Sequence, residues 1–248
     1  MQSVLNALRV LEQVSAHQPA GLSDLTRRLG LPKSTVQRCL LTLAEAGWIR
    51  ADAAGRWELT SHAFSVGARA VDAGNLRTLA MPALNDLQAT TGETIHLMVP
   101  DGDRMVLIER IDSHHQLRTV YALGSRSPMH ASANGKAYLA TLPDDQLARY
   151  LAQDLVAATR HSLTDSAGLR HDLRVVRERG YAVADEELAV GIIAVAAPIG
   201  PPGQVAMATL SISAPKVRLT DDLAEPYGHL VRDAAARITS LIPEPASG

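Results

Sequence analysis

Residues 22–59 read LSDLTRRLGLPKSTVQRCLLTLAEAGWIRADAAGRWEL, and the organisation of the N-terminal part of the chain follows from them. Leucine recurs at helical spacing across residues 22–29, and Gly30 then ends a first short helix. A second helix is predicted over residues 32–47, since proline is tolerated in a first helical turn and glycine ends a helix. Its apolar side, with Cys39 at the edge, consists of Val36, Leu40 and Leu43.

The second of these helices carries a polar and basic face on its first two turns. Such side chains donate to phosphates or to base edges, and an α-helix fits the major groove of DNA. Residues 48–49 and 57–59 then form two short strands around a turn at residues 53–55. Two helices followed by a basic hairpin indicate a winged helix-turn-helix. The pattern therefore predicts DNA binding rather than an ordinary helical hairpin with a solvated face.

The contacts of this domain with DNA are assigned by side-chain chemistry. Glutamine suits adenine, and arginine suits guanine or a phosphate. Basic residues beside the groove contact the backbone and make the affinity depend on salt. The candidates for base or adjacent phosphate contacts are Ser34, Thr35, Gln37 and Arg38. The candidates for backbone contacts are Lys33, Arg50 and Arg56.

The charge of the 248 residues is unevenly divided. Residues 1–80 hold nine Lys and Arg against six Asp and Glu, whereas the remaining residues hold 15 against 20. A mildly basic part joined to an acidic remainder suits a nucleic-acid reader attached to a domain that does not touch DNA. The single cysteine, Cys39, excludes an internal disulfide framework and a multi-cysteine metal site.

The sequence predicts neither a membrane-spanning segment nor an export signal. The most apolar run, residues 188–199, is too short to span a bilayer and contains Gly191 and Pro198. Met1 leads almost directly into an amphipathic helix, which is not the pattern of a signal peptide. We therefore expect a soluble, cytoplasmic protein without membrane contacts.

The rest of the chain alternates helical and strand-like segments. A helix over residues 3–14 is expected behind the helix-turn-helix. A helix over 61–73 is expected to join the two halves, either as a partner across a dimer axis or as a mere spacer. Further helices are predicted at 76–91, 129–140, 143–151, 166–179 and 220–242. Strands are predicted at 94–99, 105–111, 117–122, 181–185, 191–199 and 205–213, with a loop at 124–128. This order predicts an α+β unit with about six mostly antiparallel strands and helices gathered on one side.

Four segments together resemble a known family. They are GLPKSTVQR at 30–38, MHASANGKA at 129–137, GYA with DEE at 180–182 and 185–187, and GIIAVAAP at 191–198. One such segment is weak evidence, but four in the right order and spacing are strong. On these segments the sequence resembles the IclR family of bacterial transcriptional regulators along nearly its whole length.

The resemblance implies a domain organisation and a function. Residues 1–60 would form the winged helix-turn-helix, residues 61–75 a linker helix, and residues 76–248 a GAF-like effector-binding domain. Members of the family are dimers or tetramers that bind palindromic operators near genes for small-molecule catabolism, under control of a metabolite. The implied partners are double-stranded operator DNA, a small organic acid and further copies of the chain, without a cofactor. Repressor and activator use the same parts and are not distinguished.

The resemblance also implies an effector pocket. On one side the implied contacts are Met129, His130, Ala131 and backbone N–H groups at the start of the helix that contains Gly135. Such N–H groups suit a carboxylate. On the far side the implied lining residues are Ala184, Ala194, Ser211 and Ser213, with Asp185 at the pocket edge. The two serines lie two apart on a strand and face the same way.

Two of these positions depart from the family pattern. Ala184 stands where many relatives have an acidic residue, and Ala194 where many have a cysteine. A polar ligand would lose hydrogen bonds there, each worth roughly 1 kcal/mol. This favours an aromatic or branched organic acid over a very small polar acid such as glyoxylate. The alternative is that both alanines simply fill core.

The sequence favours neither a metal site nor a catalytic site. His114 and His115 point to opposite faces of a strand and cannot chelate one ion, and no HxxxH spacing occurs, so no metal site is expected. A hydrolytic triad drawn from Ser125 or Ser127, His130 and Asp185 lacks a GxSxG elbow, so catalysis is not expected.

Lys136 and the acidic residues at 185–187 are expected at the surface, and one alternative function stays open. No phosphate loop precedes Lys136, which is expected on a helix surface, and residues 185–187 are expected in a solvated turn. The alternative to a ligand-responsive regulator is a small-molecule-binding enzyme or sensor whose helix-turn-helix mediates protein contacts.

Overall fold

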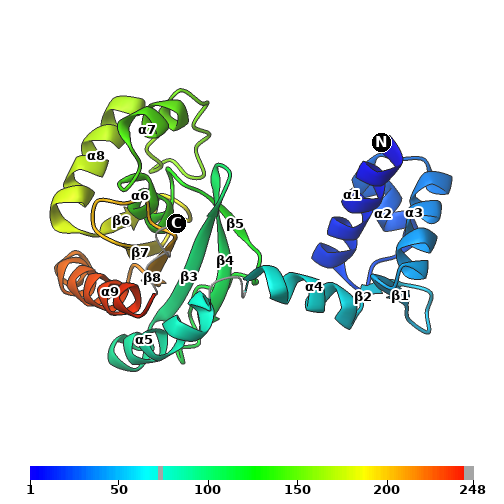
Figure 1. Cartoon of the computed structure of the whole chain (residues 1–248), viewed down its shortest axis with the longest axis horizontal. Helices are drawn as coiled ribbons and strands as arrows, with labels where there is room; N and C mark the ends of the chain where they lie inside the picture. Colours follow the sequence, from blue (N-terminus) through cyan, green and yellow to red (C-terminus); the bar gives the residue numbers. More distant parts are fainter. Residues whose placement is uncertain (72–74, 243–248) are drawn as a thin grey trace, which may run out of the picture. The chain divides into compact units, whose positions relative to one another are not determined.

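The computed structural model describes residues 1–71 and 75–242, and the chain divides into two compact units, Met1–Gly74 and Asn75–Gly248. Each unit has a hydrophobic core of its own. No helix within the described ranges is long and apolar enough to cross a membrane. The elements of both units are labelled in Figure 1.

The N-terminal unit is a winged helix-turn-helix. Its elements are α1 (Gln2–His17), α2 (Leu22–Leu29), α3 (Lys33–Glu45), β1 (Ile49–Ala51) and β2 (Trp57–Leu59). Gly30 ends α2 with φ at 62°, a left-handed conformation that glycine adopts without steric cost, and Pro32 caps α3. The core is made by Val10, Val14, Leu25, Val36, Leu40 and Ile49. The apolar spacing in the sequence therefore defines which side of each helix is buried.

Helix α4 (Ser61–Val71) follows the wing. The linker helix was expected to continue to residue 73, and residues 72–74 lie outside the described ones. On α4, Phe64 is 77% exposed, so most of its aromatic side chain is open to solvent.

The C-terminal unit contains one six-stranded sheet in which all neighbouring strands are antiparallel. Across the sheet the strands are β5 (Arg126–Pro128), β4 (Arg104–Ile111), β3 (Thr94–Asp101), β8 (Ala208–Pro215), β7 (Ile192–Ile199) and β6 (Ala182–Asp185). The helices are α5 (Leu76–Thr91), α6 (Ala133–Leu139), α7 (Asp144–Leu151), α8 (Ser166–Arg179) and α9 (Asp221–Leu241). The α+β class and the number of strands agree with the sequence.

Residues of β3, β8, β7 and β6 alternate between the two faces of the sheet. The packed face lies against α5 and α9, and its strand residues include Ile95, Leu97, Ile193, Val195, Leu210 and Ile212. The cavity face lies on the opposite side, toward α6, and its strand residues include Thr94, His96, Ala184, Ala194, Thr209, Ser211 and Ser213. Strand β8 reads ATLSISAP, so hydroxyl and apolar side chains alternate along it from Ala208 to Ala214.

The expectation of helices on one side only was wrong. Helices α5 and α9 cover one face of the sheet, and α6 and α8 belong to the core on the other face (Figure 1). The reason lies in β7, which reads IIAVAAPI and carries apolar residues on both faces. A strand that is apolar on both faces requires cover on both sides.

The strand expected at residues 117–122 does not form. Residues 112–125, which we call the strap, have no regular secondary structure, and Arg126–Pro128 in the expected loop pairs with β4 instead. Leu117, Val120 and Leu123 in the strap are each about 60% exposed, at 62%, 60% and 59%. Their side chains therefore gain nothing from alignment with the sheet, which explains the wrong prediction.

Candidate functional sites

Helix α3 presents a polar row to solvent. Val36, Cys39 and Leu40 are buried, and the side chains between them point outward. The outward residues Lys33, Ser34, Gln37 and Arg38 are exposed and Thr35 is half-buried. In the hydrogen bonds and ion pairs of the described residues, the Arg38 guanidinium has no partner. The four predicted reading residues and Lys33, which was predicted to contact the backbone, thus lie on α3 outside its buried side.

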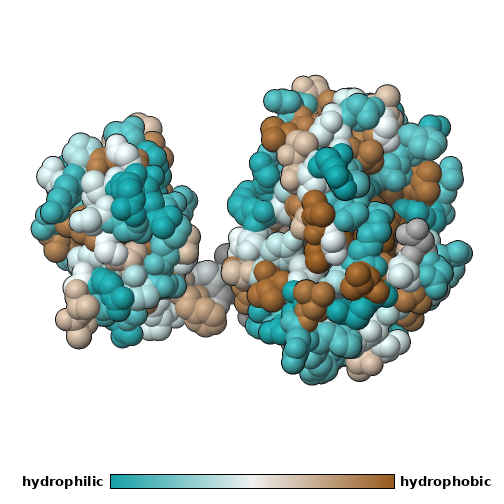
Figure 2. Space-filling model, turned by 180° about the vertical axis from the view of Figure 1, so that it is seen from behind, coloured by the Kyte–Doolittle hydropathy of each residue, from teal (hydrophilic) through white to brown (hydrophobic). Residues whose placement is uncertain are grey.

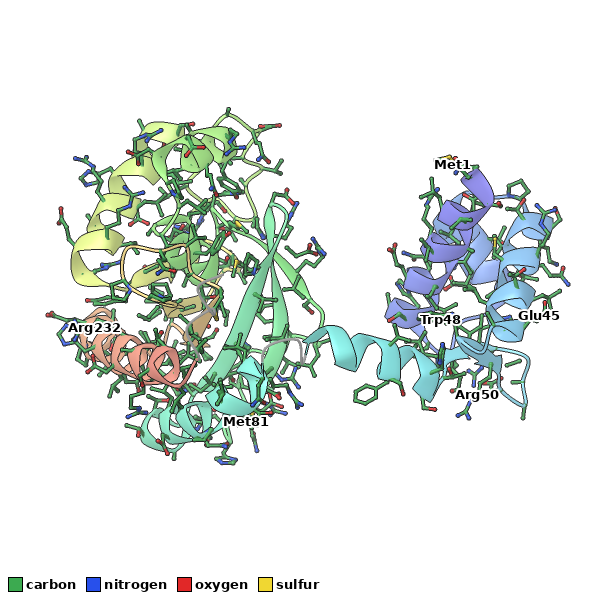
Figure 3. All side chains as sticks on the ribbon, viewed as in Figure 1. Met1, Glu45, Trp48, Arg50, Met81 and Arg232 are labelled. Atoms are coloured by element: carbon green, nitrogen blue, oxygen red, sulfur yellow. The ribbon has the colours of Figure 1, made fainter. Side chains whose placement is uncertain are left out.

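The wing places two arginines beside this helix, each already in an ion pair. Arg50 Nε donates to Glu58 Oε1 at 2.7 Å, and Arg56 Nη2 lies 2.9 Å from Asp52 Oδ2. A backbone hydrogen bond from Arg56 holds the pKa of Asp52 below its usual value. Exposed pairs of this kind are weak, so a phosphate can replace the carboxylate. Figure 3 labels Arg50 in the wing and Glu45, the last residue of α3.

A cavity of about 100 Å³ lies at the cavity face of the sheet. Its walls come from the sheet, the strap and the start of α6. The apolar lining comprises Met98, Leu107, Ala133, Ala184, Leu188, Ile192 and Ala194, and the polar lining comprises His96, Tyr121, Ser125, Arg126, Ser127, Ser132, Asn134, Ser211 and Ser213. The cavity therefore combines an apolar wall with several hydrogen-bonding side chains.

Most buried polar side chains at this cavity are paired with one another. Asn134 Nδ2 donates to Ser211 Oγ at 2.8 Å, and Thr209 Oγ1 donates to Asn134 Oδ1 at 2.9 Å. The hydroxyl groups of Thr119 and Ser213 lie 3.1 Å apart, which ties the strap to the sheet. These bonds fix the orientation of the polar lining.

His96 differs from the other polar residues of the cavity. Only 4% of its surface is exposed, and its ring meets that of Tyr121 edge-on with centroids 5.8 Å apart. Its buried Nε2 has no hydrogen-bond partner among the described residues. Burial, with a smaller contribution from the nearby Arg110 guanidinium, lowers the pKa of His96 to about 4. The imidazole is therefore neutral at physiological pH.

The structure brings four of the nine predicted effector contacts to the cavity wall. Ala184, Ala194, Ser211 and Ser213 line it.

The other five predicted contacts lie elsewhere. His130 is held by Tyr150, with its Nδ1 3.1 Å from the hydroxyl, and by the carbonyl of Val156. The Asp185 carboxylate pairs with Lys216 at 2.7 Å. Met129, Ala131 and Gly135 lie outside the lining.

Gly135 has a structural reason to be glycine. A Cβ at this position would lie 2.1 Å from the Cα of Met129, so α6 packs directly on the backbone of the preceding loop. The loop and α6 are thereby held together, with Ser132 Oγ accepting from the Gly135 N–H at 3.1 Å. The residues of this motif position the cavity wall, and the neighbouring Ser132 and Asn134 line it.

Sequence reasoning missed His96, Asn134 and Tyr121 in the lining. His96 had a usable signal, since it stands between Ile95 and Leu97 in a strand where a polar residue must face the other side. Tyr121 had none, because its place in the strap depends on an irregular path.

Lys136 was expected on a helix surface and is instead 1% exposed. Its Nζ lies 2.6 Å from Glu187 Oε1 and 2.9 Å from Asp172 Oδ2. Glu187 is buried as well, which corrects the expectation of a wholly solvated turn at 185–187, and burial raises its pKa. These contacts connect α6 to α8 and to the segment before β7.

Metal ligands are not gathered anywhere in residues 1–71 and 75–242, where no cluster of three His, Cys, Asp or Glu side chains has suitable geometry.

Comparison with known proteins gives a consistent result. The family described as "Bacterial transcriptional regulator IclR C-terminal" matches residues 68–240, and "IclR helix-turn-helix domain" matches residues 3–53. The transcriptional repressor IclR of Escherichia coli K12 is 34% identical over 244 residues, covering 96% of this chain and 89% of that protein. The repressor AllR of the same strain is 35% identical over 225 residues, covering 90% and 83%.

A solved structure is similar over the same extent. It is an IclR homologue from Microbacterium hydrocarbonoxydans in complex with 4-hydroxybenzoate. The TM-score is 0.84 at 26% identity, covering 96% of this chain and 98% of that one.

Proposed function

Because the chain belongs to the IclR family of bacterial transcriptional regulators, we propose that it controls a catabolic operon by binding an inverted-repeat operator and sensing a small organic acid. It is a DNA-binding regulator and not an enzyme. The observation that carries the proposal is the row of outward polar side chains on α3. Two relatives are named repressors, and repression is the mode that we propose.

We assign operator reading to α3 in the major groove. Gln37 and Arg38 are the strongest candidates for base edges, since glutamine pairs with adenine and arginine with guanine. Ser34 and Thr35 lie one turn earlier on the helix, where they reach bases or adjacent phosphates. Lys33, Arg50 and Arg56 are assigned to the backbone, so the affinity should fall steeply with added salt.

Arg38→Ala tests this assignment. The variant should lose specific operator binding, because a bidentate arginine contact is worth about 1–3 kcal/mol in each half-site. Its thermal unfolding should be unchanged, since Arg38 is exposed. Fluorescence anisotropy with the operator selected from random duplexes measures the effect, and Arg9→Ala on exposed α1 is the control. Unchanged operator affinity of Arg38→Ala would contradict the assignment.

A homo-oligomer with paired half-sites fits the exposed apolar residues of the N-terminal unit. Val4, Leu5 and Leu8 on α1 are 63%, 52% and 50% exposed, and Phe64 on α4 is 77% exposed. Figure 2 shows hydrophobic residues among hydrophilic ones on the surface of the smaller, N-terminal unit. We propose that a second copy covers part of this surface, so that a dimer or tetramer reads an inverted repeat. Sequencing the duplexes retained from a random pool tests for that repeat.

The cavity at the sheet is the proposed effector site. Its apolar wall, which includes Ala184 and Ala194, favours an aromatic or branched acid. We assign the carboxylate to backbone N–H groups near the start of α6 and to Arg126. A cavity of about 150 Å³ holds a benzene ring, whereas this one measures about 100 Å³. An aromatic effector therefore requires movement of a wall, for which the strap is the candidate.

A thermal-shift screen of the whole protein tests the effector class. Aromatic and branched acids should raise the unfolding temperature, while glyoxylate and other two- and three-carbon acids should not. Stabilisation by the small acids alone would refute the proposed class. An effector that changes operator occupancy needs a coupling of only about 1–3 kcal/mol between the two sites.

A further inference from the structure

The polar side chains of the cavity are not equivalent in their hydrogen bonding. Asn134 is held at both ends of its amide by Ser211 and Thr209, at 2.8 Å and 2.9 Å. Ser213 shares a hydrogen bond with Thr119 at 3.1 Å. His96 stands directly across from Ser211 in the sheet register, yet its Nε2 has no partner. We call the side of the cavity formed by His96, Ser211, Ser213 and Asn134 its floor. It contains one buried nitrogen, Nε2 of His96, to which no described residue of the protein offers a hydrogen bond.

An unpaired buried polar atom is costly, and folded proteins pair nearly all of them. Water entering the cavity can pair Nε2 in the absence of an effector. A ligand that displaces this water must then offer its own oxygen, or it loses a hydrogen bond. The apolar neighbours Met98 and Leu107 offer no such atom. The unpaired Nε2 of His96, beside apolar Met98 and Leu107, should therefore select ligands that place an oxygen next to it.

The charge distribution around the cavity indicates what kind of oxygen fits. Arg126 lines the cavity at its rim, where its side chain is 50% exposed and its guanidinium pairs with the exposed Asp101 carboxylate. Such an exposed pair is weak, so an anionic group of a ligand can replace Asp101 there. At the floor, burial keeps His96 neutral, with a pKa near 4. An unpaired carboxylate beside a neutral imidazole would be poorly solvated. The carboxylate therefore belongs near the rim, and an uncharged oxygen belongs at the floor.

We propose that His96 is a specificity-determining residue, which hydrogen-bonds an uncharged hydroxyl or keto oxygen of the effector through Nε2. The effector is thus a hydroxy or oxo acid, with one oxygen beyond those of its carboxylate. This inference rests on the proposed effector site. It concerns which acids are selected there and leaves operator binding untouched.

Calorimetric titration of the full-length protein with matched acids tests the inference. The probes are benzoate against 4-hydroxybenzoate, and butyrate against 2-hydroxybutyrate and 2-oxobutyrate. In at least one series the acid with the extra oxygen should bind the wild type at least about tenfold more tightly. In His96→Leu this preference should fall to within about threefold, and His96→Gln should recover part of it.

Thermal unfolding without ligand separates recognition from a merely structural role. Removing an unsatisfied polar atom is neutral or stabilising, so His96→Leu should unfold at the wild-type temperature or above it. Ser211→Ala, which breaks the bond to Asn134, should unfold at a lower temperature.

Several outcomes would overturn the inference. They are a clearly lower unfolding temperature of His96→Leu, equal discrimination by the wild type and His96→Leu, or no preference for the oxygenated acids in the wild type. Operator binding of the wild type without ligand, measured in parallel, reports on the proposed function separately. If the wild type binds its operator selectively but shows no preference among the acids, only the role of His96 is refuted.

Discussion

The two faces of the six-stranded sheet are built from the same strands but have different roles: one packs into a core, and the other lines a cavity. On β8, Leu210 and Ile212 are fully buried in the packed face against α5 and α9. Their neighbours Ser211 and Ser213 are equally buried, but they point to a cavity and carry hydroxyl groups. The difference teaches that burial alone does not identify core. One face is held by apolar contacts, and the other combines a second apolar core around α6 and α8 with a few specific polar contacts.

The largest predicted effect on stability concerns Lys136 on α6, the helix that packs on the cavity face. Lys136→Met removes the ammonium that contacts Glu187 and Asp172 and leaves the buried Glu187 carboxylate and the half-buried Asp172 carboxylate without this counter-ion. Breaking a buried pair from one side costs about 3–5 kcal/mol. Urea denaturation measures the loss, and a second change, Glu187→Gln, should recover part of it.

Lys216→Met is the matched control for this experiment. Lys216 pairs with Asp185 at 2.7 Å, but its side chain is 40% exposed. Exposed pairs contribute little, so this variant should be close to wild type. Equal effects of the two lysine substitutions would remove the distinction between a buried and a solvated ion pair here.

The next effect concerns the packed face. Ile212→Ala leaves a cavity among residues that are fully buried, and large-to-small core changes of this kind cost about 2–5 kcal/mol. Ser211→Ala, its neighbour on the other face, should cost about 1 kcal/mol, because it loses one hydrogen bond. Chemical denaturation of both variants measures the ratio. If Ser211→Ala proved as destabilising as Ile212→Ala, the two faces would contribute to stability alike.

The third effect sharpens the comparison through pH. The folded pKa of His96 is about 4, below the unfolded value near 6.5. The unfolded chain therefore binds the proton first, so the free energy of unfolding is unaffected by His96 titration above about pH 6.5 and decreases as the pH falls toward 4. Between pH 7 and pH 5 this amounts to roughly 2 kcal/mol.

The difference between the wild type and His96→Leu isolates this contribution from that of other groups. From pH 7 to pH 5 the free energy of unfolding should fall by that amount more in the wild type than in His96→Leu, so the difference between the two proteins shifts in favour of the variant. Parallel curves for the two proteins would mean that His96 is protonated in the folded state as readily as in the unfolded chain.

Much of this architecture is local and was predictable. Leucine spacing and a following glycine gave α5 its bounds, and the alternation of β8 placed Ser211 and Ser213 on one side. What failed depended on distant partners. Lys136 is buried because residues 36 and 51 positions further along the chain supply carboxylates, and the strap is irregular because its exposed leucines and valine gain nothing from a sheet.

The lining of the cavity was likewise predictable where it depends on strand alternation. Four lining residues lie on strands whose alternation can be read from the sequence. His130 looked like a contact, but Tyr150 on α7 holds its imidazole away from the cavity lining. His96 was overlooked although its strand neighbours are apolar on both sides, Ile95 and Leu97.

The alternation of β8 has an evolutionary consequence. Thr209, Ser211 and Ser213 meet the cavity side, while Leu210 and Ile212 meet the core. Substitutions at every second codon therefore alter the chemistry offered to a small molecule, and the codons between them maintain the fold. A lineage can change the polar groups on this side of the strand while the buried residues between them keep the core intact. A deletion of a single codon, in contrast, would exchange both roles at once.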